Sequence, residues 1–161
     1  MAPDDRQCQS DLAATQASFG DMRREAFEFD QARMLYQPAL EIRSAVVQRD
    51  LTDIGGQTEY CQTLIRLRHV ANGEHDVSTS RDHYVEAYDR LKQHTDYGKS
   101  YVKFHRTRAN VCGYLNQLSL RSNDLATAEY YIEQMRAIAE RLAEIDRNNF
   151  ADRLNVAFSQ S

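Results

Sequence analysis

Small and large apolar residues recur along the chain at helical spacing. Tyr36 follows Ala32 by four residues and Ala39 follows it by seven, which places all three on one face of a helix. The small side chains let a neighbouring helix approach, and the aromatic ring fills the space beside them. The pattern therefore predicts a helix that packs against a second helix through this face.

The same order of residues recurs twice more, at intervals of 48. The later sets are Ser80, Tyr84 and Ala87, then Ala128, Ile132 and Met135. Upstream of each set, the same interval recovers a second, partly apolar helix face: Gln16, Phe19 and Gly20; Leu64, Leu67 and Arg68; Cys112, Leu115 and Asn116. A fixed period of this length indicates a helical repeat in which each unit is a pair of helices.

Turn and cap residues divide the chain at the same interval. They lie within units at 72–76 and 122–124, and between units at 53–56, 96–98 and 146–149. We interpret the pair Gly55-Gly56 as the end of a helix. The expected helices are 5–25, 29–50, 57–72, 77–94, 99–121 and 125–147, with a seventh from about 149 to the terminus.

These helices predict an all-α fold of stacked antiparallel hairpins in a single domain, 1–161. The units are about 5–52, 57–96 and 99–147, and a fourth unit starts at 149–161. An up-and-down bundle would have the same helix lengths but would need no fixed period, so the period favours the stacked array.

The repeat residues resemble those of the tetratricopeptide repeat family. That family has a leucine-glycine pair in its first helix and alanine, aromatic and alanine in its second, which Phe19-Gly20 and Ala32, Tyr36 and Ala39 match best. Units of 48 residues exceed the usual repeat of about 34, and Ser44, Lys92 and Glu140 replace the proline that ends the second helix. The resemblance implies a right-handed superhelix whose concave surface, lined by the first helix of each unit, binds peptides or proteins.

The resemblance also implies which residues contact a partner. Transferred by position, the groove residues are Ala17, Ser18 and Asp21, then Gln62, Ile65, Arg66 and His69, then Asn110, Tyr114 and Gln117. Arg66 offers a planar donor fork for carboxylates and Tyr114 an amphipathic face, and both residue types are enriched where binding energy concentrates. The alternative for each residue is an ordinary solvated helix face. One subgroup of the family binds the C-terminal carboxylate of chaperone tails with lysines and asparagines. The corresponding positions of this sequence hold other residues, so binding to chaperone tails is not expected.

The end of the chain is apolar at helical spacing. Phe150, Leu154 and Phe158 lie on one face of the expected seventh helix. The last hairpin of a repeat array exposes an apolar face unless something covers it. We therefore expect the chain to be a piece of a larger protein, or another copy to cover this face.

Composition and charge narrow the class of partner. Of 161 residues, 42% are hydrophobic and 27% charged, as in an ordinary globular protein. The formal charge is −4 with both signs interspersed, so no extended basic surface is available to bind nucleic acid. Residues 1–10 lack the apolar core of a secretory signal, and the sequence has no apolar run long enough to span a membrane. With three widely spaced cysteines, we expect reduced thiols and a cytoplasmic location.

Motifs of catalysis and metal binding are missing from the sequence. The five histidines include no pair at metal-ligand spacing, and there is neither a nucleophile elbow nor a phosphate-binding loop. Cys8 precedes the first clear unit, which leaves open whether its thiol is reactive. We therefore expect no enzyme, no metal and no cofactor.

The sequence favours a scaffold or adaptor that binds proteins or peptides on its concave face. Its contacts would be Gln62, Arg66, His69, Asn110, Tyr114 and Gln117. One alternative is a self-assembly module that forms a homo-oligomer through its C-terminal helix. Another is a sensor that binds a small molecule or signal peptide in a pocket of Arg66 and the tyrosines.

Overall fold

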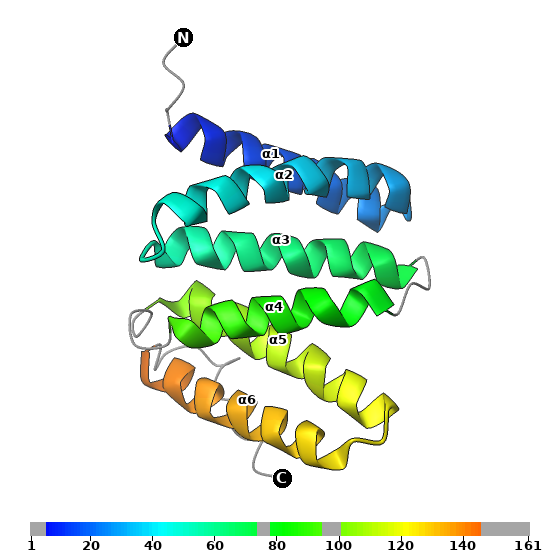
Figure 1. Cartoon of the computed structure of the whole chain (residues 1–161), viewed down its shortest axis with the longest axis vertical. Helices are drawn as coiled ribbons and strands as arrows, with labels where there is room; N and C mark the ends of the chain where they lie inside the picture. The colour runs from blue at the N-terminus through cyan, green and yellow to red at the C-terminus, as the bar shows by residue number, and fades with distance from the viewer. Residues whose placement is uncertain (1–5, 74–77, 95–100, 146–161) are drawn as a thin grey trace. The chain divides into compact units, whose positions relative to one another are not determined.

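The computed structural model describes residues 6–73, 78–94 and 101–145. Within these ranges the chain forms six α-helices and no strand (Figure 1), which confirms the predicted all-α class. The helices are α1 Arg6–Glu25, α2 Phe29–Arg49, α3 Ile54–Gly73, α4 Ser78–Gln93, α5 Val102–Arg121 and α6 Leu125–Ile145. The expected seventh helix, with Phe150, Leu154 and Phe158, lies outside the described residues.

The helices are regularly spaced along the sequence. α1, α3 and α5 begin at residues 6, 54 and 102, and each has 20 residues. The chain divides into two compact units, Met1–Ala87 and Tyr88–Ser161, and the boundary between them falls within α4. A single domain of three repeats therefore stays a prediction.

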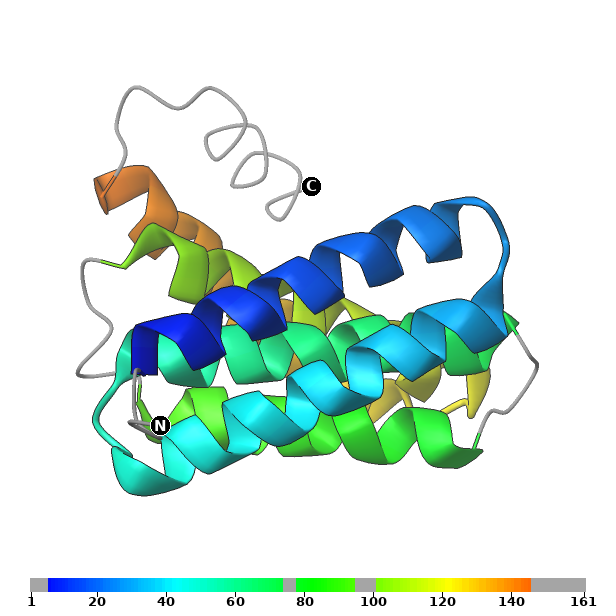
Figure 2. The same cartoon turned by 90° about the horizontal axis from the view of Figure 1, so that it is seen from above.

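In the unit Met1–Ala87, α1 and α2 form an antiparallel hairpin and α3 lies against both (Figure 1 and Figure 2). Two backbone hydrogen bonds close the hairpin turn. The Glu28 N–H donates to the Arg23 carbonyl at 2.9 Å, and the Phe27 N–H donates to the Arg24 carbonyl at 3.0 Å. This is a Schellman motif, in which Phe27 takes the left-handed conformation with a φ of 61°.

The repeat residues form the contact between α1 and α2. Ala32, Tyr36 and Ala39 are fully buried, as their spacing predicts. Gly20 lies so close to the Tyr36 ring that a Cβ atom at residue 20 would be 2.5 Å from the ring atom Cε1. The absence of a side chain at Gly20 thus makes room for the ring. The core around it is completed by Ala17 of α1 and by Leu67 and Val70 of α3.

The start of α3 differs from the expectation. Gly55 and Gly56 do not end a helix, because α3 begins at Ile54 and both glycines lie in its first turn. The Asp53 carboxylate caps this turn, with Oδ1 accepting the Gly56 N–H at 3.0 Å. A Cβ atom at residue 56 would lie 2.6 Å from Asp53 Oδ2, so the glycine allows the carboxylate to close over the helix start.

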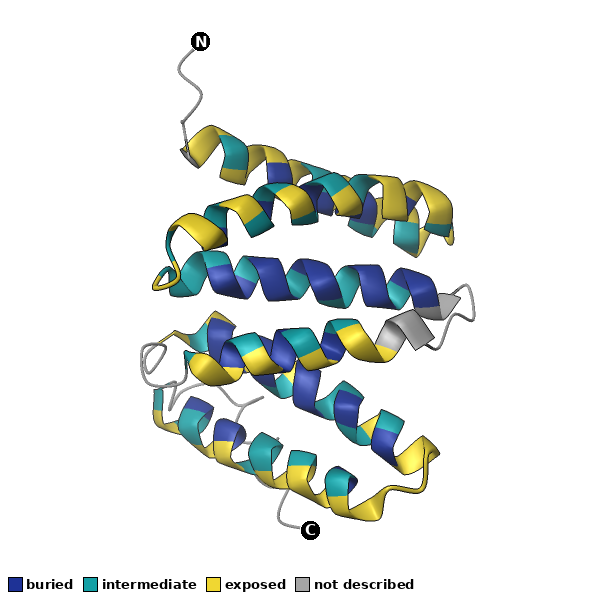
Figure 3. Cartoon of the chain, in the orientation of Figure 1, coloured by how far each residue is buried: buried dark blue, intermediate teal, exposed yellow. Residues whose placement is uncertain are grey.

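Residues of α4 in the same unit cover another side of α3. The Tyr60 hydroxyl donates to Glu86 Oε1 at 2.6 Å. The Arg68 guanidinium lies 5.1 Å from the centre of the Tyr84 ring, in a cation–π contact. Figure 3 shows the result: α3 is mostly buried, whereas α1 has long exposed stretches.

In the unit Tyr88–Ser161, α5 and α6 form a second hairpin. Its turn is again a Schellman motif: the Asp124 N–H donates to the Ser119 carbonyl at 2.9 Å, and Asn123 has a φ of 57°. Asp124 then caps α6 by accepting the Thr127 N–H at 3.1 Å. The turn expected at 122–124 is confirmed.

The third set of repeat residues departs from the pattern in one place. Ala128 is buried as expected, and its carbonyl accepts a hydrogen bond from Asn116 Nδ2 at 2.8 Å. Ile132 stands where the first set has Tyr36, but it is 42% exposed, so its expected packing role is wrong. The neighbouring Tyr131 packs instead, edge-on to Tyr88 with 5.4 Å between ring centres.

None of the helices in the described ranges combines the length and apolar character that a membrane span requires.

Candidate partner-binding site

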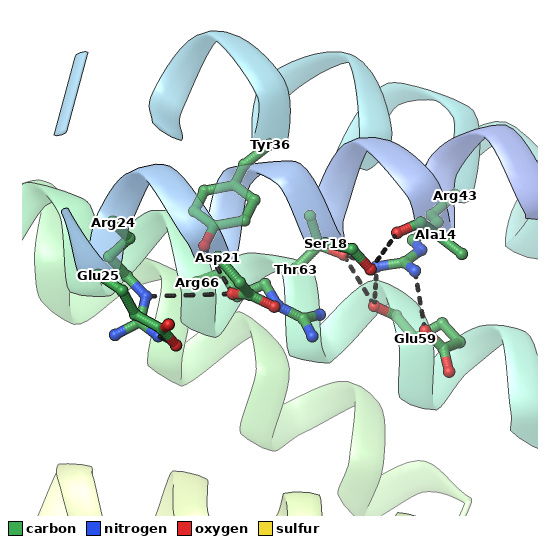
Figure 4. Close-up of polar contacts among 10 residues, drawn as sticks. All are labelled: Ala14, Ser18, Asp21, Arg24, Glu25, Tyr36, Arg43, Glu59, Thr63 and Arg66. Carbon is green, nitrogen blue, oxygen red and sulfur yellow. Dashed lines mark hydrogen bonds and ion pairs between the residues drawn. The ribbon is translucent and has the colours of Figure 1, made fainter. Parts of the chain in front are cut away.

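Asp21 and Arg66 join α1 to α3 on the face where the resemblance places partner contacts. Arg66 Nε donates to both carboxylate oxygens of Asp21, at 3.1 Å each (Figure 4). The two side chains stay partly exposed, at 28% for Arg66 and 31% for Asp21. The charge-assisted contact holds the Arg66 guanidinium in one position at the surface.

Asp21 is also held from two other directions. It accepts a hydrogen bond from the Tyr36 hydroxyl at 2.7 Å, and Arg24 Nε lies 4.0 Å from its Oδ1 atom. Burial and the hydrogen bond to Asp21 raise the pKa of Tyr36 above its usual range, so the phenol remains a donor. Asp21, itself a candidate contact, therefore orients Arg66 within the chain.

Arg66 retains an unused hydrogen-bond donor. Its Nη1 atom is buried and has no hydrogen-bond partner within the described residues. A buried donor without an acceptor costs about 1–3 kcal/mol. The Arg66 side chain as a whole is 28% exposed, so its other atoms reach the surface.

Gln62 and His69 lie beside Arg66 on α3. The three residues are separated by four and then three positions, so they share one helix face, and all are half-buried. Burial, with the positive charges of Arg24 and Arg68 nearby, lowers the pKa of His69. The neutral imidazole offers one donor and one acceptor beside the guanidinium.

A second polar cluster on the same helices was not expected from the sequence. Arg43 of α2 is buried and contacts the Glu59 carboxylate at 2.8 Å, the Glu59 carbonyl at 3.2 Å and the Thr63 hydroxyl (Figure 4). Burial lowers the pKa of Arg43 from its usual value, and the Glu59 charge opposes that effect. Arg43 continues the helical spacing of Tyr36 and Ala39 toward Val47, which was the available sign that this arginine is buried.

The remaining predicted contacts lie on α5, in the other unit. Asn110 and Gln117 are exposed and Tyr114 is half-buried, at spacings that place them on one helix face. That they line one groove together with Arg66 and His69 stays a prediction.

The described residues include no group of three histidine, cysteine or carboxylate side chains that could hold a metal ion. Cys61 and Cys112 are buried, and burial raises the pKa of the Cys112 thiol to about 11, so it is protonated at neutral pH. Cys8 is exposed.

A cavity of about 810 Å³ opens between α1, α2 and the start of α3. Its lining includes Arg43, Glu59, Asp50 and Asp53, but neither Arg66 nor any tyrosine. This cavity is therefore not the pocket of Arg66 and the tyrosines that was expected for a sensor.

These features define the class of protein. The described residues form an all-α fold of helical hairpins, and the first helices of the hairpins carry polar side chains at the surface.

Comparison with solved structures finds similar chains. The first tetratricopeptide repeat domain of Spaghetti (RPAP3), bound to the HSP90 peptide SRMEEVD, is 15% identical, with a TM-score of 0.48 over 94% of each chain. TTC0263, a thermophilic tetratricopeptide repeat protein of Thermus thermophilus, is 15% identical, with a TM-score of 0.44 over 92% of this chain and 98% of that one. No family model and no curated protein matches the sequence.

Proposed function

We propose that this protein is a binding module for a peptide or protein segment, and that Arg66 is its central contact. The observation that carries the proposal is the Arg66 side chain, which Asp21 holds through Nε while 28% of it stays exposed. A fixed donor loses little conformational entropy when a partner binds, so more of the interaction energy appears as affinity.

The chemistry around Arg66 suits a polypeptide ligand. A carbonyl or carboxylate oxygen of the ligand accepts from the guanidinium, while Gln62 and His69 offer both donors and acceptors on the same face. This combination matches the alternating carbonyl and amide groups of a peptide backbone. We therefore place the contact face on α1 and α3, with Ser18, Gln62, Arg66 and His69 as its residues.

The proposal also includes three contacts on α5, which are Asn110, Tyr114 and Gln117. Tyr114 would add apolar area to the contact, and the two amides would add hydrogen bonds. An adaptor role in the cytoplasm extends the same proposal. Binding, in place of catalysis, is the activity we assign.

The test is a selection of random peptides on the immobilised chain. Peptides that are recovered are then titrated into the wild type, Arg66→Gln and Arg66→Lys, with affinity followed by fluorescence anisotropy. We expect both substitutions to weaken binding about tenfold or more, because neither replacement offers the planar donor fork.

Arg33→Gln is the matched control, because Arg33 is exposed on α2 and is not one of the proposed contacts. Its affinity should equal that of the wild type. Circular dichroism of each variant checks that the helices remain. If every selected peptide binds Arg66→Gln as tightly as the wild type, the proposal is wrong.

A further inference from the structure

An exposed apolar stripe runs along α1. Cys8, Leu12, Thr15, Phe19 and Met22 follow one another at alternating steps of four and three, and all five are exposed. Leu12, Phe19 and Met22 are 51%, 55% and 64% exposed. We call these five residues the α1 seam. A repeat of about 3.5 residues is the spacing with which one helix pairs along another.

The α1 seam faces away from the core of its own hairpin. The residues that α1 buries are Ala13, Ala17 and Gly20, which are offset from the seam by helical spacing. Asp21, which holds Arg66, also lies outside the seam. The seam is therefore not used by the hairpin core or by the proposed peptide contacts.

The corresponding residues of α3 show what such positions do when another helix is present. At the spacing of 48 that separates the starts of α1 and α3, Leu12, Phe19 and Met22 correspond to Tyr60, Leu67 and Val70. These three are only 6%, 7% and 0% exposed. Leu67 and Val70 pack against Ala17, Ala32 and Tyr36 of the preceding hairpin. The α1 seam thus has the side chains of a helix–helix contact, but no second helix from the described ranges covers it.

We propose that the α1 seam pairs with the α1 seam of a second copy of this chain, as a parallel, in-register dimer. A twofold pair needs one self-complementary surface, and a seam at heptad spacing with Leu12, Phe19 and Met22 as its large apolar residues supplies it. The packing face of α2 is not available to a second copy, because Ala32, Tyr36 and Ala39 are already fully buried.

The charges beside the seam select the parallel direction. Asp11, Ser18 and Glu25 border one edge of the seam, and Gln9, Gln16 and Arg23 border the other. An antiparallel pair would place Asp11 against Glu25 of the second copy at two places, which is repulsive. A parallel pair places Asp11 against Gln16 and Ser18 against Arg23, with no like charges in contact.

Sedimentation equilibrium of the full chain tests the pairing. The wild type is expected to dimerise, and the double variant Leu12→Gln, Phe19→Gln is expected to weaken dimerisation at least about tenfold. Met34→Gln is the matched control, because Met34 is 75% exposed on α2 and outside the seam. It should dimerise like the wild type. All three positions are exposed, so the monomers should remain folded, which circular dichroism checks.

Cys8 tests the direction and the register of the helices. In the parallel pair the two Cys8 thiols face each other, and diamide, which accepts the two electrons and two protons released, should link them in a disulfide. Cys8→Ser should abolish the linked dimer, because Cys61 and Cys112 are buried.

Three results would overturn the proposal. If the chain stays monomeric at every concentration, the seam does not pair with a second copy, and a helix of another polypeptide is its partner. A dimer that is unaffected by the double variant lies on another surface. A seam-dependent dimer without the Cys8 link is not parallel and in register.

Discussion

Asp21 is the residue on which the geometry of the candidate site depends. Its carboxylate accepts hydrogen bonds from Tyr36 of α2 and Arg66 of α3, so one side chain of α1 links three helices. Arg66 could be chosen as a candidate from the sequence because of its residue type and repeat position. Its pairing with Asp21, 45 residues away, could not, because it depends on how α3 is aligned against α1.

His69 gives a pH-dependent prediction at the same scale. Burial and the charges of Arg24, Arg68 and Arg66 lower its folded-state pKa below the usual 6.5, and Asp21 opposes this effect. The folded protein therefore binds a proton less readily than the unfolded chain. The stabilising contribution is fully present above the unfolded pKa and is lost as the pH falls through the folded pKa.

Urea unfolding of the wild type and His69→Gln at about pH 7.5 and about pH 5.5 measures this contribution. The wild type should lose more unfolding free energy on acidification than the variant does. Other groups that titrate in this range are common to both proteins and cancel in the comparison. Equal losses of unfolding free energy in the two proteins would show that protonation of His69 does not destabilise the fold.

At the scale of helices, periodicity was sufficient to predict burial where the buried residues of a helix are spaced along one face. The buried set Ala32, Tyr36 and Ala39 was predicted correctly because its spacing marks one face. Gly55-Gly56 was assigned to the wrong end of a helix, since glycine composition does not distinguish an end from a start capped by Asp53. Phe19 matches the leucine of the repeat but is exposed, because no described helix covers that side of α1.

The close contact between Gly20 and Tyr36 predicts that even a methyl group at residue 20 destabilises the protein. A Cβ at residue 20 would meet three ring atoms at 3.0 Å or less, and the buried ring has little room to move. Gly20→Ala should therefore lower the unfolding free energy by about 1–3 kcal/mol despite the higher helix propensity of alanine.

Gly113 of α5 is the matched control for this substitution. A Cβ there would lie 3.7 Å from its nearest neighbour, the Met135 Cε atom, at ordinary contact distance. Gly113→Ala should raise the unfolding free energy by about 0.5–1 kcal/mol through helix propensity. Denaturant unfolding of both variants checks the pair, and a Gly20→Ala protein as stable as the wild type contradicts the packing argument.

At the scale of the whole molecule, α1 presents two surfaces with different chemistry. Asp21 lies on the polar side shared with Arg66, the apolar α1 seam lies on another side, and Ser18 lies at the border between the two. Peptide binding and self-association therefore depend mainly on different residues of α1. A variant of one surface should leave the other activity intact, which keeps the two proposals independently testable.

Photo-crosslinking from Gln62 tests the central claim most directly. A photoreactive amino acid replaces Gln62, one turn from Arg66 on α3, and in a matched variant it replaces the exposed Met34 of α2. After illumination with a selected peptide, mass spectrometry should find the peptide attached at position 62 and not at position 34. Attachment at position 34 alone, or at neither position while the peptide remains bound, would contradict a contact face on α1 and α3.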